Sequence, residues 1–395
     1  MTPLAGVRVL DLSRLLPGPY ATLVLADLGA QVDKIEDTAG GDYLRIMPPT
    51  VKGGGGDGQP ADATSSIFLA LNRNKRSAVI DLKKPEAKDA FLRLIKTYDV
   101  LLETFRPGVL DRLGLSHEKL LETHPRLVIC AISGYGQTGP LSQRAGHDLN
   151  YVSRAGVLGQ QGPADGPPTL PGFQLADVSG GLYAVIGIMG ALLERARTNQ
   201  GRVVDVAMVE TAMPFAIAGF GLMFGEQAPQ RGAEALTGGI APYQTYATKD
   251  GRAMALASLE PKFWMQFSAG IGHAVDMSDL VPGEHQAALK QKLAEVFATK
   301  TQAEWVQFAS ERDCCLEPVL SPAEAAADAH LAARKMFFTL DSPWGPIKQM
   351  RTPLTPADKQ HVPPPRSGEH TDDVLRDGGL ADDEIAKLRA SGAIR

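Results

Sequence analysis

The sequence predicts an α/β fold built on a parallel sheet, followed by a smaller α+β domain. Short strand-like runs alternate with helical patterns through the first half of the chain, and this alternation is typical of a parallel sheet with helices on both faces. The length of 395 residues exceeds the usual size of one domain. After about Phe224 the pattern changes to a hairpin followed by helices.

The first forty residues predict one strand, turn, helix and strand unit, and the pattern then repeats. The strands are expected at 7–12, 31–36, 77–82, 100–104 and 127–132, with helices at 21–29 and 85–98. Between them, 52–60 is rich in glycine but lacks the Gly-Lys-Ser/Thr ending of a phosphate loop, so we interpret it as a surface insertion. A long helix is expected over 178–197, with Asp177 at its N-cap.

In the second half, two strand patterns at 243–247 and 253–257 flank Lys249-Asp250-Gly251, which predicts a hairpin. Helical segments follow up to about Phe337. The stretch 340–366 is rich in proline and is expected to be extended, and 372–391 is expected to form a terminal helix.

Composition excludes several classes of protein. The net charge of -5 argues against nucleic acid as the main partner. We find no run near the roughly 18 apolar residues of a membrane helix and no signal peptide, so we expect a cytoplasmic protein without a membrane partner. Cys130, Cys314 and Cys315 lack C-x-x-C spacing, so we expect neither disulfides nor a metal site.

Three residues are candidates for acid/base chemistry. His147 stands in a glycine-rich loop after a strand, where ligands of parallel sheets bind, and histidine titrates near neutral pH. Asp177 and Glu260 are carboxylates at the ends of predicted elements. From local pattern alone, a structural histidine, a helix cap and a solvent-facing carboxylate remain alternatives.

Basic residues gather at strand-to-loop transitions. Arg73, Asn74 and Lys75 lie just before a predicted strand, and Arg45 and Arg106 stand near two other transitions. Such a set can bind phosphates, although a solvated loop is the alternative.

Several motifs together resemble the CoA-transferase family III (CaiB/BaiF) superfamily, and within it the α-methylacyl-CoA racemases. The segment 145–151, Ala-Gly-His-Asp-Leu-Asn-Tyr, is similar to the racemase branch. The superfamily resemblance rests on 4–13, 17–19, 25–30, 72–77, 105–109 and 201–210.

The resemblance implies an enzyme of fatty acid and lipid metabolism that acts on acyl-CoA. It implies that His147 and Asp177 exchange protons with opposite faces of the α-carbon, and that Glu260 pairs with the histidine. No metal or separate cofactor is expected, because CoA is part of the substrate. The residues implied to contact CoA are Arg45, Arg73, Asn74, Lys75, Arg106, Gly146, Asp148 and Tyr151.

The resemblance also implies a Rossmann-like large domain, 1–225 completed by 338–395, a small domain, 226–337, and an interlocked homodimer. An enolate-like intermediate needs hydrogen-bond donors, for which we name the backbone N–H groups after Asp177. The helix dipole there lowers the pKa of Asp177 unless burial opposes it. The alternatives are a CoA-transferase with Asp177 as nucleophile, and a scaffold without turnover.

Overall fold

The computed structural model describes residues 2–53 and 63–395 and divides them into two compact units. Unit 1 comprises 1–152, 174–212 and 329–395, and unit 2 comprises 153–173 and 213–328. Most of the predicted insertion at 52–60 therefore lies outside the described residues. The domain boundaries predicted from the sequence, at 225 and 338, stay a prediction.

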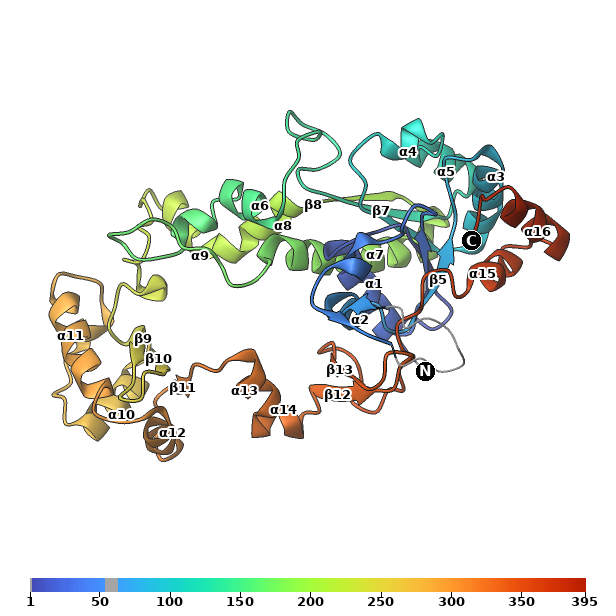
Figure 1. Cartoon of the computed structure of the whole chain (residues 1–395). Coiled ribbons are helices and arrows are strands. Elements are labelled where there is room, and N and C mark those ends of the chain that lie inside the picture. The colour runs from blue at the N-terminus through green and yellow to red at the C-terminus, as the bar shows by residue number, and fades with distance from the viewer. Residues whose placement is uncertain (1, 54–62) are drawn as a thin grey trace. The chain divides into compact units, whose positions relative to one another are not determined.

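Unit 1 is built on a six-stranded sheet in the order β5-β2-β1-β6-β7-β8, and every neighbouring pair is parallel (Figure 1). This confirms the α/β class. The strands are β1 Arg8–Asp11, β2 Gln31–Glu36, β5 Lys75–Val79, β6 Val100–Glu103, β7 Val128–Ser133 and β8 Val203–Ala207, the last of which was not predicted.

Helices cover both faces of this sheet. One face carries α1 Pro17–Asp27 and α7 Leu175–Thr198, which pack on each other and on the strands. The α1 backbone approaches α7 so closely that a Cβ at Gly181 would lie 2.7 Å from the Pro17 carbonyl oxygen. Helices on the other face share one apolar core with the sheet. They include α3 Pro85–Leu94, α5 His117–Thr123, α15 Thr371–Asp377 and α16 Asp382–Ala390.

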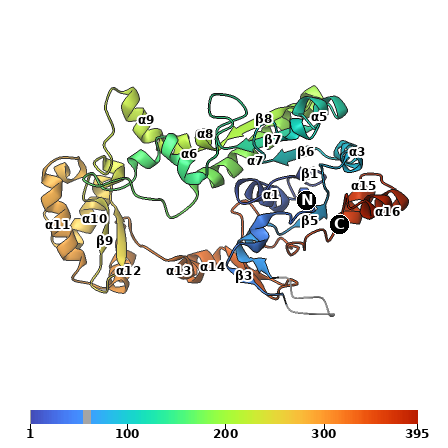
Figure 2. The ribbon, with the colours of Figure 1, turned by 45° about the horizontal axis from the view of Figure 1, so that its top comes forward.

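The end of the chain packs onto unit 1. In both views α15 and α16 lie beside β5 and α3 (Figures 1 and 2). Ile394 forms a bridge with Ile80, and the Thr371 hydroxyl accepts a hydrogen bond from the Val79 N–H. The single terminal helix predicted over 372–391 is wrong: Gly378 and Gly379 separate two helices, because Gly379 adopts a positive φ of 81°.

The remaining elements of unit 1 are short. The predicted extended stretch 340–366 includes part of a hairpin of β12 Phe337–Leu340 and β13 Ile347–Met350. The others are β3 Thr50–Val51, β4 Thr64–Ser65, α2 Ser66–Leu71, α4 Val109–Arg112, α8 Met208–Ala212, α14 Ala329–Ala333, and the 3₁₀ helices η1 Tyr43–Ile46 and η2 Ile95–Thr97; α6, Asp148–Arg154, continues into unit 2.

Unit 2 contains a three-stranded antiparallel sheet, β11-β10-β9, which confirms the predicted hairpin. Its core is aromatic: Trp264, Phe267, Phe297 and Trp305 are fully buried, and each ring packs against the next. Its elements are β9 Tyr243–Ala247, β10 Ala253–Ala257, β11 Leu316–Pro318, α9 Ile217–Phe224, α10 Pro261–Ile271, α11 His285–Phe297, α12 Gln302–Ser310, α13 Pro322–Ala327, η3 Leu158–Gln160, η4 Met213–Ala216, η5 Ala235–Thr237 and η6 Met277–Leu280.

The prediction from the sequence that no apolar segment approaches the length of a membrane helix is wrong, because α7 is such a segment. Its 24 residues are long and apolar enough to cross a membrane, although no run of that kind was recognised in the sequence. The apolar character has a local cause, because one side of α7, including Ala184 and Ile188, is buried against α1 and the sheet. A buried core helix passes the same length and hydropathy test.

Candidate active site

A cavity of about 740 Å³ opens at the carboxyl edge of the sheet in unit 1. Its walls include Arg14 after β1, the segment 104–107 after β6, and 132–134 at the end of β7. From β1 the chain continues to β2 and β5 on one side of β1. It then crosses to β6 on the other side, so the strand order reverses beside β1. Ligands of open parallel sheets bind at such a reversal, and the volume suits a small-molecule site.

His147 lies in the wall of this cavity, at the start of α6. Its backbone N–H donates to Oδ1 of Asn150, and its carbonyl accepts from the Asn150 N–H, so the backbone around it is fixed. The imidazole is exposed, and it makes no hydrogen bond or ion pair with any residue in 2–53 or 63–395. The ring is therefore available for proton transfer with a ligand.

Tyr151 supports the loop that carries His147. Its hydroxyl donates to the Gly146 carbonyl at 2.6 Å, and its ring packs edge-on against Tyr135. A Cβ at Gly146 or at Gly134 would lie 2.7 or 2.5 Å from the Tyr151 ring, so only glycine fits at both places. Burial, with a smaller contribution from the Asp177 carboxylate, raises the pKa of Tyr151 to about 12 and keeps this donor protonated.

Asp177 lies in the same wall as His147, in the first turn of α7. Burial, and secondly the negative charge of Asp148, raise the pKa of Asp177 to about 7. Burial therefore prevails over the helix dipole in the competition that the sequence left open. A carboxyl with a pKa near neutrality can both accept and donate a proton at neutral pH.

Asp148 occupies a different place from the one predicted. It is buried, is not among the residues that line the cavity, and its Oδ1 accepts hydrogen bonds from the N–H groups of Ala176 and Asp177. The N-cap position predicted for Asp177 is wrong, because α7 begins one turn earlier, after Gln174. The N–H group of Val178, the first of the donors after Asp177 that were predicted to hold the enolate oxygen, already donates to the Gln174 carbonyl.

Most of the predicted basic residues are held in ion pairs or hydrogen bonds away from the cavity lining. Arg45 is paired with Glu36, and Arg73 with Asp27. The fully buried Lys75 donates to the Pro19 carbonyl and to Asn72, and burial lowers its pKa to about 7. Asn74 bonds to Asp27 and His361. The binding role assigned to these side chains stays a prediction.

Arg14, which is paired with Asp37, and two other arginines line the cavity itself. Arg106 was predicted, whereas Arg144 was not. Both are exposed, and neither guanidinium forms an ion pair or hydrogen bond with the part of the chain that the structure describes. Arg144 precedes His147 by three residues in one loop, and this proximity was the signal available in the sequence.

Glu260 belongs to unit 2. It stands at the N-cap of α10, where its carbonyl accepts from the N–H groups of Phe263 and Trp264, and its side chain is exposed. Its expected pairing with His147 stays a prediction.

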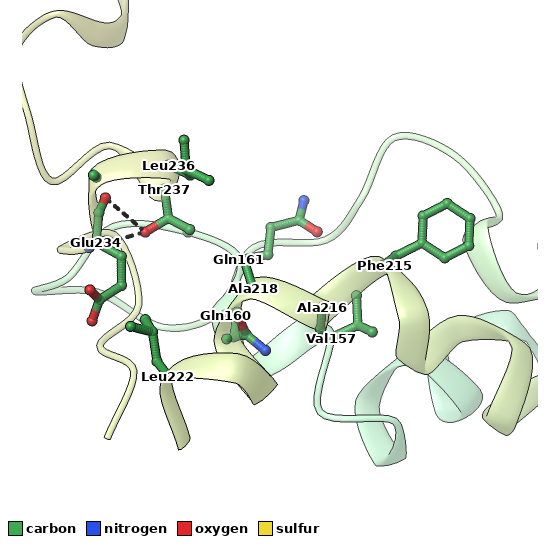
Figure 3. A pocket seen from close by; sticks show the side chains of 13 residues that line it. Val157, Gln160, Gln161, Phe215, Ala216, Ala218, Leu222, Glu234, Leu236 and Thr237 are labelled. Atoms are coloured by element: carbon green, nitrogen blue, oxygen red, sulfur yellow. Dashed lines mark hydrogen bonds between the residues drawn. The ribbon is translucent and has the colours of Figure 1, made fainter. Parts of the chain in front are cut away.

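Unit 2 has a cavity of its own, of about 710 Å³ and mainly apolar (Figure 3). Its one carboxylate, Glu234, is joined to Thr237 by a capping box around η5. The predicted site residues are not in its lining, which includes Val157, Phe215, Ala216, Leu222 and Leu236. No cluster of three or more metal-ligating side chains occurs within 2–53 and 63–395.

Comparison with known proteins identifies the family of the chain. A family model described as CoA-transferase family III matches residues 4–371. The chain is 38% identical to the α-methylacyl-CoA racemase of Mus musculus, over 98% of this chain and 96% of that one. It is 31% identical to the succinyl-CoA:glutarate CoA-transferase of Mus musculus, covering 100% and 91%. The crystal structure of a CaiB/BaiF family protein from Brucella suis superposes with a TM-score of 0.81 at 30% identity, over 95% of this chain and 99% of that one.

Proposed function

The chain belongs to CoA-transferase family III, and from this premise we propose that it inverts the α-carbon of 2-methylacyl-CoA thioesters by proton transfer between two residues. One observation carries the proposal: His147 and Asp177 line a single cavity, and the pKa of Asp177 is raised to about 7. The similarity to a racemase supports the same assignment.

The chemistry requires a base on one face of the α-carbon and an acid on the other. For one enantiomer, Asp177 takes the α-proton while protonated His147 returns a proton to the opposite face; for the other, the roles reverse. The C–H electron pair passes to the thioester carbonyl in an enolate and returns when the new C–H bond forms. Glu260 pairs with the imidazole in this proposal and stabilises its protonated form.

The CoA moiety is part of the substrate, and the proposed enzyme uses no other cofactor or metal. We assign its phosphates to Arg106 and Arg144, whose guanidinium groups line the cavity without a partner among the described residues. Gly146 and Tyr151 contact the thioester end. Arg45, Arg73, Asn74 and Lys75 then act on CoA indirectly, through the backbone that their ion pairs and hydrogen bonds hold.

A CoA-transferase is the second candidate, and the similarity to a succinyl-CoA:glutarate CoA-transferase favours it. Asp177 would then attack the thioester as a nucleophile, forming a mixed anhydride and releasing CoA thiolate. The thiolate attacks the Asp177 carbonyl and expels the donor acid, and the acceptor carboxylate then displaces the thiolate to form a second anhydride. The thiolate finally attacks the acceptor acyl carbonyl, which yields the new thioester and regenerates the Asp177 carboxylate. A raised pKa makes this carboxylate less abundant below neutral pH. His147 has no assigned step in that reaction.

The proposed enzyme is a cytoplasmic homodimer, and α7 supplies one surface for it. Leu182, Ile186, Met189 and Leu193 recur at helical spacing on the exposed side of α7. An apolar stripe of this kind fits a second copy of the chain. Sedimentation of the wild type and of an Ile186→Glu, Leu193→Glu double variant tests this interface. A wild-type dimer that dissociates in the double variant supports α7 as the interface. A monomeric wild-type protein contradicts the proposed dimer.

The deciding experiment follows the α-proton. The protein is incubated with (S)-2-methylacyl-CoA in D₂O without an acceptor acid, and NMR records α-deuteration beside the stereochemical composition. Deuteration with racemisation, lost in His147→Ala and Asp177→Asn, supports the two-residue mechanism. No deuteration, together with CoA transfer once a carboxylic acid is added, assigns the protein to the transferase branch.

A further inference from the structure

The first turn of α7 has no side-chain cap from its own sequence. Its N-cap residue, Gln174, makes no capping hydrogen bond, and the first N–H groups of any helix lack partners within the helix. Oδ1 of Asp148 fills this gap, accepting from the Ala176 N–H at 2.6 Å and from the Asp177 N–H at 3.1 Å. The cap therefore comes from α6, which is 28 residues earlier in the chain.

The residue that supplies this cap is joined directly to His147. The imidazole of His147 lines the cavity, whereas the Asp148 carboxylate is buried, with a relative exposure of 9%, and reaches the backbone of Asp177 instead. The segment His147-Asp148 therefore has two roles. It carries His147, and through Asp148 it fixes the turn of α7 that carries Asp177. A shift of Asp148 would move both side chains relative to the ligand.

Resting on the proposed function, we propose that Asp148 is a positioning residue: its carboxylate fixes the first turn of α7 so that Asp177 and His147 face a common α-carbon. A buried carboxylate is stable there because two N–H groups and the positive end of the helix dipole compensate its charge. Its carboxylate is not part of the cavity lining, so in this proposal it acts on the reaction through α7 and not by contact with the acyl-CoA.

The same charge affects the proton affinity of Asp177. Beyond burial, Asp148 is the group that raises the Asp177 pKa. The other charged or titratable groups of the cavity walls are His147, Tyr151, Arg14, Tyr43, Arg106 and Arg144. The elements packed against α7 carry the titratable groups Tyr20 and Asp27 of α1, Glu210 of α8, Asp205 of β8 and Cys130 of β7.

Two substitutions separate the hydrogen bonds from the charge. Asp148→Asn keeps an acceptor oxygen for both N–H groups and removes the charge, whereas Asp148→Ala removes both. In Asp148→Ala we expect kcat to fall roughly 100-fold, as a small displacement of a catalytic group does, with KM for acyl-CoA within about twofold. Hydrogen–deuterium exchange of the unliganded protein should be faster across 174–180 in that variant only.

In Asp148→Asn, exchange across 174–180 should stay slow. The acidic flank of kcat/KM against pH should move to lower pH, by on the order of one unit, because Asp177 loses its proton more easily without the neighbouring charge. Glu122→Gln, an exposed substitution on α5, is the matched control and should leave exchange, kcat and the pH profile as in the wild type.

Two results would overturn the proposal. A tenfold rise in KM with unchanged kcat in Asp148→Asn would make Asp148 a substrate ligand. Unchanged exchange across 174–180 in Asp148→Ala would show that it does not hold α7. Since exchange is measured without turnover, a wild-type protein that leaves the α-proton in place refutes the proposed function while the exchange data still decide the role of Asp148.

Discussion

The guanidinium group of Arg73 is fully buried and donates to both carboxylate oxygens of Asp27. Its remaining nitrogen donates at 2.9 Å to Gln349, which is 276 residues after Arg73, so one side chain joins the end of α1 to β13. The Thr352 hydroxyl also donates a hydrogen bond to the Asp27 carboxylate. A residue held in this way supports the fold of unit 1 and has no free donor face for a ligand.

Arg73→Ala should therefore destabilise the protein by about 3–5 kcal/mol, because the Asp27 carboxylate is left buried without its partner. Urea denaturation measures the loss. Arg93→Ala is the control, since its ion pair with Glu384 is exposed and should be worth under about 1 kcal/mol. A stable Arg73→Ala protein with weakened CoA binding would instead restore the role predicted from the sequence.

This arginine shows where prediction from the sequence ends. The alternation of strands and helices is a local signal, and it predicted β1, β2, β6, β7 and the parallel sheet within one or two residues. Whether Arg73 is exposed depends on Asp27, 46 residues away, and on Gln349. Contacts at such separations leave no periodic trace in the chain, so the sequence could not show that Arg73 is buried in an ion pair with Asp27.

Arg106→Ala and Arg144→Ala should each raise KM for acyl-CoA by roughly 10-fold or more, because a charge-assisted hydrogen bond to phosphate contributes about 1.5–3 kcal/mol. The free energy of unfolding should stay unchanged, since neither side chain has a partner among the described residues. Calorimetric binding of CoA at two salt concentrations tests the assignment. Arg112→Ala, on the exposed side of α4, is the control; equal affinities in all variants would exclude both arginines.

His147 and Asp177 were predictable as neighbours for a general reason. The loops that follow parallel strands meet at one edge of the sheet, and His147 lies in such a loop, after β7. The start of α7 reaches the same edge because α7 connects the parallel strands β7 and β8, so it must run back from the carboxyl end of one to the amino end of the other. The role of Asp148 was not predictable, because a cap supplied from another helix has no local sequence pattern.

The raised pKa of Asp177 gives stability a definite dependence on pH. The folded state holds its proton up to about pH 7, whereas the unfolded state releases it near the ordinary aspartate pKa of 3.8. Stability is therefore full below the unfolded pKa and falls as pH rises through 7. Asp177→Asn stays neutral, so it should match the wild type at pH 4 and exceed it at pH 8 by on the order of 2 kcal/mol, allowing for solvent in the cavity.

Thermal unfolding of the wild type and Asp177→Asn at several pH values measures this difference. Asp89→Asn, an exposed carboxyl on α3, should show no comparable increase between the two pH values. A stability difference that shrinks with rising pH would mean that the Asp177 pKa is lowered, as the helix dipole alone would cause.

The contact between Gly146 and Tyr151 sets the position of the His147 loop. In Gly146→Ala the new methyl would lie 2.7 Å from the Tyr151 ring and 3.2 Å from the Tyr135 hydroxyl, so the loop must move. We expect a loss of about 1–3 kcal/mol of stability, the usual range for overpacking, and a kcat reduced by roughly 100-fold because His147 moves with the loop.

A double-mutant cycle isolates the cause. In a Tyr151→Leu background the ring edge that the methyl meets is gone, so Gly146→Ala should cost less than it does alone, and the two effects should not add. Gly159→Ala serves as the control, since a Cβ there meets nothing within 4 Å. If the two effects add strictly, the Gly146→Ala defect arises from the backbone of Gly146 itself. Tyr151 would then not be the residue that holds His147 in the cavity wall.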